Sequence, residues 1–300
     1  MADRRLQVFH AVAKHLSFTR AADALFMTQP AVTFQIKHLE EQYGTRMFER
    51  RSTGITLTPA GEIVLSFAER ILALSDEMDT RLSEMTSEMR GPLLVGASTT
   101  IAEFMLPRIL GEFNSLYPQV RARLIVANSE SIESRVAELT LDVGLIETPA
   151  KLPSLSSHLC CEDELQVICA PDSPLADAQR IKPRELVDYE FISREPGSGT
   201  REISDAYFQQ HGIAPSSLKT QMELGSPEAL KGVVATGLGF AIASRAVAEK
   251  EVMLGELRSI ALDPPLRRGL YLVHPKDRFQ SLLTATFIQF ARSKMQEMSS

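Results

Sequence analysis

The chain begins with two stretches in which apolar residues recur every three or four positions. Leu6 and Phe9 share that spacing, so they would lie on one face of a first helix. Ser17 follows and is a favoured N-cap residue, which predicts a second helix over residues 18–25. Small alanines in that second helix allow another helix to approach it closely.

A third helix is predicted over residues 29–43 and has two distinct faces. Thr28 offers an N-cap, Pro30 is acceptable in the first turn, and Gly44 is typical of the position just past a helix. The inward stripe consists of Val32, Ile36 and Leu39. The outer face consists of Gln29, Pro30, Thr33, Phe34 and Lys37.

This outer face carries groups of the kind that contact base pairs. Amide, hydroxyl and ammonium groups donate hydrogen bonds to base edges in a major groove, and the ring of Phe34 can meet a thymine methyl. The alternative is a solvated helix face without a partner. An exposed Phe beside Gln and Thr is unusual on such a face, which favours contact with DNA.

A basic hairpin follows the third helix. Residues 46–58 have the pattern of two short strands around a turn at residues 52–54. The residues near its tip are Arg50, Arg51, Ser52 and Thr53. A basic β-ribbon suits contact with phosphates or with a minor groove. A helix, a short turn, a helix and a basic hairpin together predict a winged helix-turn-helix.

One long amphipathic helix is predicted over residues 59–89, with Thr58 as its N-cap and a break at Gly91-Pro92. Its apolar residues follow alternating spacings of three and four, as in a coiled-coil seam. These residues are Val64, Phe67, Ile71, Leu74, Met78 and Met85. The alternative is a helix that packs on its own domain. Three heptads favour a seam between two chains, and the acidic outer face suits solvent.

From residue 93 onward, β-branched and apolar runs alternate with helical patterns. The predicted strands cover residues 93–97, 122–126, 141–146, 165–169, 191–192, 239–243 and 270–273. The predicted helices cover residues 103–116, 131–139, 204–211, 226–236 and 281–296. This alternation predicts an α/β region with largely parallel sheets.

The charge fits a DNA-binding protein once it is divided along the chain. The net charge of −6 hides eight Lys and Arg against five Asp and Glu in residues 1–58, a balance of +3. The positive end is where phosphates would be met. No apolar run suits a membrane span, and the N-terminus has no signal-peptide core. We therefore expect a protein of the cytoplasm that contacts no membrane.

Three cysteines lie close together in the sequence. Adjacent Cys160 and Cys161 on a strand would point to opposite faces, and Cys169 lies further along. Half-buried, unreactive thiols are one interpretation, and a redox switch is the other. Neither the cysteines nor the scattered histidines have metal-ligand spacing, so we expect no metal and no cofactor.

The head of the chain resembles the LysR-type transcriptional regulators. The resemblance is carried by SFTRAA at residues 17–22, TQPAVT at 28–33 and LTPAG at 57–61, with further matches at 6–9, 35–36, 39–40, 44 and 48–50. It implies that the outer face of the third helix lies in a major groove and that residues 50–53 form the wing. It also implies a homodimer or homotetramer on a two-fold-related site in double-stranded DNA, with RNA polymerase as a partner if the protein activates.

The same resemblance implies the domain organisation. The DNA-binding domain would span residues 1–58, a linker helix for dimerisation residues 59–90, and an effector-binding domain residues 91–300. The last is similar to two-lobed periplasmic binding proteins, with lobe I at residues 92–162 and 268–300 and lobe II at 163–267. Ligands in such folds bind between the lobes, at strand ends and helix N-termini.

Three stretches are candidate walls of the effector site. They are Ser98, Thr99 and Thr100; Asn128 and Ser129; and Gly197, Ser198, Gly199, Thr200 and Arg201. Hydroxyls, open main-chain amides and the charge of Arg201 predict a small anionic effector: a carboxylate, phosphate, sulfate or sulfite. The alternative is an ordinary glycine turn with Arg201 in a surface ion pair. The run EPGSGTR at residues 195–201 also resembles regulators of carbon fixation or sulfur assimilation.

Three other functions compete with this interpretation. An enzyme would need a nucleophile, a base or a metal, and no such set emerges from local spacing, so we expect no catalysis. A transport binding protein would need a secretion signal and no winged head. A redox sensor would keep the DNA function and change only the trigger.

Overall fold

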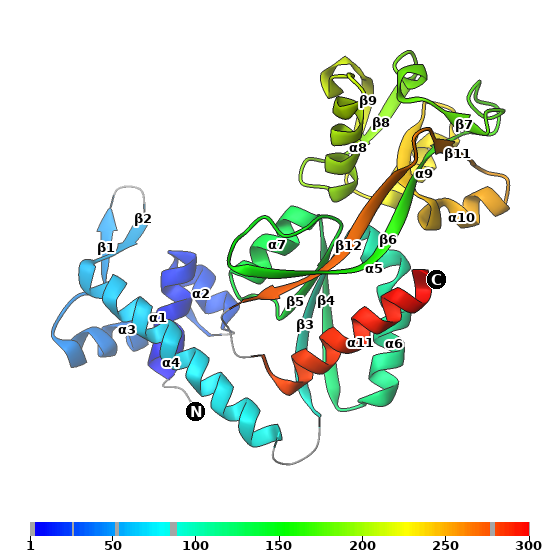
Figure 1. Cartoon of the computed structure of the whole chain (residues 1–300). Coiled ribbons are helices and arrows are strands. Elements are labelled where there is room, and N and C mark those ends of the chain that lie inside the picture. The colour runs from blue at the N-terminus through cyan, green and yellow to red at the C-terminus, as the bar shows by residue number, and fades with distance from the viewer. Residues whose placement is uncertain (1–3, 26, 52–53, 85–88, 277–279, 300) are drawn as a thin grey trace. The chain divides into compact units, whose positions relative to one another are not determined.

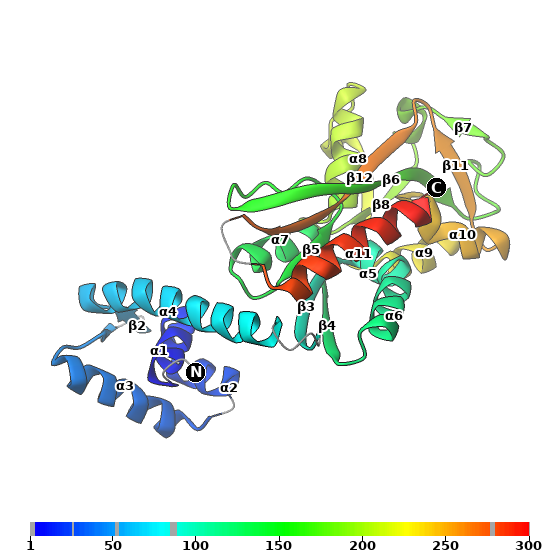
Figure 2. The same ribbon diagram turned by 60° about the horizontal axis from the view of Figure 1, so that its bottom comes forward.

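The chain divides into two compact units, residues 1–88 and residues 89–300, which we call the head unit and the regulatory unit (Figures 1 and 2). The computed structural model describes residues 4–25, 27–51, 54–84, 89–276 and 280–299. Within those ranges, no helix combines the length and the apolar content that a membrane span requires.

The described residues of the head unit form four helices and one hairpin. They are α1 (Arg4–His15), α2 (Phe18–Ala24), α3 (Gln29–Tyr43), β1 (Phe48–Arg51), β2 (Gly54–Leu57) and α4 (Pro59–Glu84). The N-caps predicted at Ser17 and Thr28 are confirmed, because each hydroxyl accepts a main-chain amide of the following turn. Gly44 ends α3 in the left-handed conformation, as expected.

Aromatic side chains tie the hairpin to the helices of the head unit. Phe9 of α1 and Phe18 of α2 both pack against Phe48 of β1, with ring centroids 5.2 and 5.9 Å apart. The predicted inward stripe of α3 is buried in the same core: Val32, Ile36 and Leu39. The assignment of the two faces of α3 is therefore confirmed.

α4 contacts the head core with one face and exposes a second apolar row. Ala68 is buried in the head core, and Val64, one turn earlier on the same face, packs against it. Placing Val64 in the seam was therefore wrong. The exposed row is Ile63, Phe67, Ile71, Leu74 and Met78. Met85, the last predicted member, lies outside the described residues.

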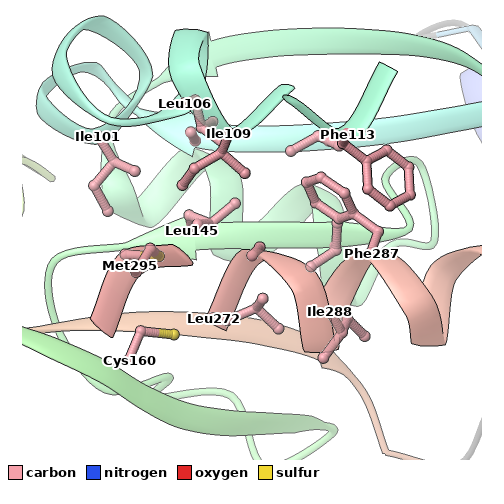
Figure 3. Close-up of a cluster of buried hydrophobic side chains, with 14 of the residues drawn as sticks. Ile101, Leu106, Ile109, Phe113, Leu145, Cys160, Leu272, Phe287, Ile288 and Met295 are labelled. Atoms are coloured by element: carbon pink, nitrogen blue, oxygen red, sulfur yellow. The ribbon is translucent and has the colours of Figure 1, made fainter. Parts of the chain in front are cut away.

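Lobe I of the regulatory unit is built on parallel strands covered by helices. β3 (Gly91–Ser98) pairs in parallel with β4 (Val120–Ala127) and β5 (Val143–Ile146). The helices are α5 (Thr99–Phe104), α6 (Leu106–Leu116), α7 (Ser129–Ala137) and α11 (Leu282–Ser299). In Figure 3, Phe113 of α6 meets Phe287 of α11 edge to face, with centroids 5.1 Å apart. The helix predicted over residues 103–116 is two helices, since a proline in the first turn of α6 cannot continue α5.

Lobe II has its own core and a second, smaller parallel pair. β8 (Glu190–Arg194) pairs with β9 (Lys219–Leu224). The other elements are β7 (Arg180–Ile181), α8 (Gly199–Gln210), α9 (Pro227–Ala235), β10 (Ala241–Ser244), α10 (Arg245–Met253), β11 (Arg258–Leu262) and the 3₁₀ turns Pro183–Leu186 and Pro215–Ser217. The sequence did not predict β9 because nearly all of its side chains are exposed and no apolar pattern marks it.

Two long strands run through both lobes. β6 (Leu155–Cys169, green in Figure 1) pairs antiparallel with β12 (Leu266–Pro275, orange). Their lobe I ends contribute to one core and their lobe II ends to the other. β12 must run against β6 because it returns the chain to lobe I. The expectation of largely parallel sheets is therefore wrong here, and β10 and β11 also pair antiparallel with β6.

A bulge in β6 overturns the expectation that Cys160 and Cys161 face opposite ways. Cys161 pairs with Leu270 and Leu159 with Tyr271, so Cys160 is the extra residue between them. Both thiols consequently lie in the core of lobe I. Burial raises the pKa of all three cysteine thiols, that of Cys161 to about 12. A thiol with a raised pKa is a poor nucleophile, which weighs against the redox-sensor interpretation.

Candidate functional site

The predicted DNA-contacting face of α3 is open to solvent. Gln29, Pro30, Thr33, Phe34 and Lys37 are all exposed, and Phe34 exposes 64% of its surface. The Gln29 amide Nε2 donates to the Thr33 hydroxyl at 3.2 Å, and that hydroxyl donates to the Gln29 main-chain oxygen at 3.0 Å. The two side chains thus form a small polar unit one turn apart.

Lys37 can leave its present partner at little cost. Its ammonium lies 3.7 Å from the Glu41 carboxylate, and both side chains are largely exposed. An exposed pair of this kind contributes about 0–1 kcal/mol, so a phosphate can replace the carboxylate easily. The ring of Phe34 lies beside His38, with centroids 6.3 Å apart. The exposed face therefore combines cationic, polar and aromatic groups.

The hairpin is fixed to α3 through Glu40. Its Oε1 accepts the main-chain amides of Met47 at 2.7 Å and Phe48 at 3.3 Å. In the ladder, Arg50 pairs with Ile55 and Arg51 with Gly54, which puts both arginines next to the turn. Ser52 and Thr53 lie outside the described residues. In the sequence Glu40 is notable only as part of the resemblance at residues 39–40, and its role as a positioning group follows from the fold.

The end of the hairpin is fixed by the start of α4. The Thr58 hydroxyl donates to the main-chain oxygen of Arg46 at 2.7 Å and accepts the amide of Gly61 at 3.1 Å. A β-carbon at Gly61 would clash with the main-chain oxygen of Met47. The sequence LTPAG thus joins wing and helix through a cap and a close backbone approach.

In the regulatory unit, several predicted effector residues surround one buried carboxylate, that of Glu147. Ser98 Oγ donates to Oε1 at 2.9 Å, and Thr200 Oγ1 donates to Oε2 at 2.9 Å. Thr100 is a further hydrogen-bond partner. Ser98 and Thr100 belong to lobe I and Thr200 to lobe II. The lobes therefore meet at a cluster of hydroxyl groups, and no sequence motif pointed to Glu147.

A buried arginine of β12 completes this cluster. Arg268 Nη1 lies 2.5 Å from Glu147 Oε2, and Nη2 lies 2.7 Å from Asp163 Oδ2. Burial alone would raise the pKa of Glu147, but the charge of Arg268 and the hydroxyl hydrogen bonds outweigh it, and the pKa is lowered. Ser244 donates to the other oxygen of Asp163 at 2.7 Å. Glu147 is thus ionised, and its carboxylate is surrounded by hydroxyl and guanidinium donors.

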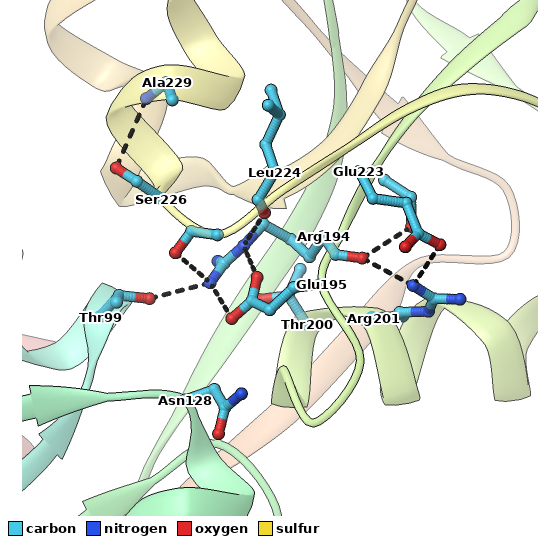
Figure 4. A network of polar contacts seen from close by, with 12 residues as sticks. Thr99, Asn128, Arg194, Glu195, Thr200, Arg201, Glu223, Leu224, Ser226 and Ala229 are labelled. Carbon is cyan, nitrogen blue, oxygen red and sulfur yellow. Dashed lines mark hydrogen bonds and ion pairs between the residues drawn. The ribbon is translucent and has the colours of Figure 1, made fainter.

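A second arginine, Arg194 of lobe II, reaches across to lobe I. Its side chain is 4% exposed, and Nη2 donates to Thr99 Oγ1 at 3.0 Å (Figure 4). Glu195 accepts from Nε at 2.8 Å and from Nη2 at 3.1 Å, and Leu224 O accepts from Nε at 3.1 Å. This cation stands at the lobe contact where the sequence had suggested Arg201.

The glycine-rich loop packs on lobe I. Asn128 Nδ2 donates to Pro196 O at 3.1 Å, and the amide of Glu130 donates to Gly197 O at 3.2 Å. Gly197 has φ +84°, and a β-carbon there would lie 2.7 Å from Glu130 Oε2. A β-carbon at Gly199 would lie 2.6 Å from that of Glu147. These glycines are needed for turn geometry and close approach.

The remaining predicted residues have structural roles of their own. Ser129 is buried, and its hydroxyl accepts the main-chain amide of Glu147 at 3.3 Å. Ser198 is buried at the N-cap of α8 but makes no side-chain capping bond. Arg201 Nη1 donates to Glu223 at 2.6 Å and to Arg194 O at 3.0 Å, on the side of the network away from Thr99 (Figure 4). The ion pair of the alternative interpretation is thus present, with Glu223 as the partner of Arg201, and contact of Arg201 with an effector stays a prediction.

Comparisons with known proteins agree with this architecture. Residues 4–62 match the family model "Bacterial regulatory helix-turn-helix protein, lysR family", and residues 86–296 match "LysR substrate binding domain". The chain belongs to the LysR family: it is a transcriptional regulator with a DNA-binding head and an effector-binding domain, and not an enzyme. The predicted fold class is confirmed.

Several relatives of the chain are named as RuBisCO transcriptional regulators. The chain is 36% identical over 289 residues to the "Probable RuBisCO transcriptional regulator" of Cyanidioschyzon merolae, with 95% of each chain covered. It is 34% identical over 287 residues to the "RuBisCO operon transcriptional regulator" of Acidithiobacillus ferrooxidans, covering 95% of this chain and 92% of the relative. These names agree with the narrower resemblance noted for residues 195–201.

A solved structure of a relative contains a ligand. The regulatory domain of Synechocystis PCC6803 CcmR, in complex with 2-PG, is 31% identical and has a TM-score of 0.64. That match covers 70% of this chain and 99% of the CcmR chain. HinK from Pseudomonas aeruginosa matches 98% of both chains with a TM-score of 0.62, and at 18% identity it supports the fold alone.

Proposed function

We propose that this regulator binds a small anion between its lobes and that this binding changes how its heads contact DNA. The observation that carries the proposal is the lobe contact itself. Arg194 of lobe II reaches Thr99 of lobe I, and hydroxyls of both lobes converge beside it. Hydroxyl and guanidinium donors are the groups that bind phosphate or carboxylate. CcmR in complex with 2-PG supports the same ligand class for this chain.

The DNA-binding element is α3 with the wing. Gln29, Thr33 and Phe34 would read base edges, while Lys37 and the arginines of β1 would contact phosphates or the minor groove. The exposed row of α4 would form the seam of a dimer, and two dimers would form a tetramer, in the cytoplasm. For an activator, RNA polymerase would be a further partner.

The proposed switch is a population shift between lobe arrangements. Every cross-lobe hydrogen bond changes length when the lobes move, so an anion held by both lobes binds one arrangement better than another. The preferred arrangement then changes how dimers associate and how the heads are spaced on DNA. The effector acts only through its difference in affinity for the two states.

A thermal-shift screen tests the proposal on the full chain. Inorganic phosphate, sulfate, 2-PG and a dicarboxylate are the probes, and at 100 times its Kd a true ligand stabilises by about 2.7 kcal/mol. Thr99→Val should reduce the stabilisation, because it removes a lobe I hydroxyl beside the guanidinium of Arg194. Thr140→Val is the matched control, since that hydroxyl only donates to Arg135 O in lobe I.

Footprints on a DNA site selected by the chain itself provide the functional readout. The protected region should differ in length or bending with and without the stabilising anion. Identical footprints at saturating anion, or equal effects of the two threonine substitutions, would rule out the proposed switch.

A further inference from the structure

Glu147 follows β5 directly and points into the junction of the two lobes. Its residue exposes 2% of its surface, and its main-chain amide donates to Ser129 Oγ at 3.3 Å. The backbone of Glu147 is therefore held in place by β5 before it and by the hydrogen bond to Ser129. A β-carbon on Gly199 of lobe II would collide with Glu147 Cβ, so the two lobes are in direct contact at this residue.

The partners of this carboxylate form an anion-binding set. Ser98 and Thr200 donate one hydroxyl each, at 2.9 Å. Arg268 Nη1 contributes a full positive charge at 2.5 Å and also donates to Thr200 Oγ1 at 2.8 Å. Hydroxyls and a guanidinium are also the donors that bind a small carboxylate or phosphate arriving from solution. These donors come from both lobes and from β12, the strand that joins them.

The charge of Glu147 makes it a competitor for such an anion. Its pKa is lowered, so it remains ionised at neutral pH. An incoming anion would meet a fixed negative charge to which Ser98, Thr200 and Arg268 Nη1 already donate. The single positive charge of Arg268 is already shared with Asp163, which accepts from its Nε at 2.8 Å, so it does not neutralise a further anion beside Glu147.

We propose that Glu147 is an internal ligand: its carboxylate occupies the effector's anion position in the effector-free chain, and an effector must displace it from the hydroxyls of Ser98 and Thr200. This inference rests on the proposed function, which places the effector between the lobes. It explains how the lobes stay joined without effector, since Glu147 bridges them through the same donors.

The test measures inorganic phosphate binding to the full chain by isothermal titration calorimetry. Glu147→Gln removes the competing charge while keeping the side-chain volume. Phosphate affinity should rise by at least roughly tenfold, which corresponds to about 1.4 kcal/mol. Glu147→Asp keeps the charge but withdraws it by one methylene, so it should give a smaller gain.

Glu133→Gln is the matched control. Glu133 is a second buried carboxylate of lobe I, and its Oε1 accepts the main-chain amides of Lys151 and Leu152 at 2.5 and 2.6 Å, away from Arg268. This substitution should leave phosphate affinity unchanged. Circular dichroism establishes that each variant is folded before titration.

The outcomes separate this inference from the proposed function. A gain in phosphate affinity for the Glu147 variants supports the inference even if no anion alters DNA binding by the unchanged chain, which would refute only the switch. An anion response in the unchanged chain without any gain in the variants overturns the inference alone. Loss of folding by both Glu147 variants would assign the residue to stability and overturn it as well.

Discussion

Replacing Arg268 by Met should destabilise the regulatory unit strongly. The Arg268 side chain is fully buried, and its partners Glu147 and Asp163 are 2% and 12% exposed. Methionine fills much of the same space but leaves the buried Glu147 carboxylate without its cation. Removing one partner of a buried ion pair costs about 3–5 kcal/mol, because the other charge stays desolvated.

That cost converts into a large shift of the unfolding temperature. For a domain of this size, 1 kcal/mol corresponds to about 2–4 °C, so the midpoint should fall by about 6–20 °C. The variant should also reverse the pH dependence. In the unchanged chain the pKa of Glu147 lies below its ordinary 4.5, so its contribution is present at neutral pH and is lost only as the pH falls through that lowered value.

Without Arg268, burial becomes the dominant influence and raises the pKa of Glu147. The penalty on the ionised form should then shrink as the pH falls from about 8 to about 5, because protonation relieves it. Thermal unfolding of the full chain at several pH values measures both effects. Arg267→Met is the matched control: this neighbouring arginine is 64% exposed and lies 3.9 Å from Glu162. An exposed pair contributes about 0–1 kcal/mol. Equal costs for the two substitutions would refute the reasoning.

Three further predictions concern packing, DNA contact and assembly. Gly199→Ala should destabilise the fold by about 1–3 kcal/mol, since its β-carbon would lie 2.6 Å from Glu147 Cβ in lobe I. The control Gly232→Ala meets nothing within 4 Å and should stabilise the fold by about 0.5–1 kcal/mol. Equal unfolding temperatures would contradict this packing. Gln29→Ala should relax base preference, and Lys37→Ala should weaken binding to all DNA and flatten its salt dependence in titrations; equal losses on selected and random duplexes would contradict those roles. Phe67→Asp should yield monomers in sedimentation velocity, and an unchanged mass would disprove the seam.

The head unit was predictable because its signals are local. The caps at Ser17 and Thr28 and the stop at Gly44 lie within a few residues of the helix ends that they define. The two faces of α3 follow from a 3.6-residue period within that one helix. Among the described residues of the head unit, the position of Val64 was misjudged, since a regular spacing cannot tell a seam from the helix's own core.

The regulatory unit was predictable in its elements but only partly in its site. Hydroxyls at strand ends and glycines before α8 were visible in the sequence, and the fold brings Ser98, Thr100 and Thr200 together. The sequence did not predict the pairing of Arg201 with Glu223, because Glu223 lies on the exposed strand β9, which has no apolar pattern.

Sequence alone determined that the chain has a DNA-binding head, a long apolar helix and a sensor of α/β type. Only the tertiary structure decided what fills the junction of the lobes. Glu147 and Arg268 are 121 residues apart, and Arg194 and Thr99 are 95 apart. No local period or cap links such positions. Their pairing depends on how β6 and β12 cross between the lobes. A charged side chain affects the fold this strongly only when it is buried, because burial removes its hydration water.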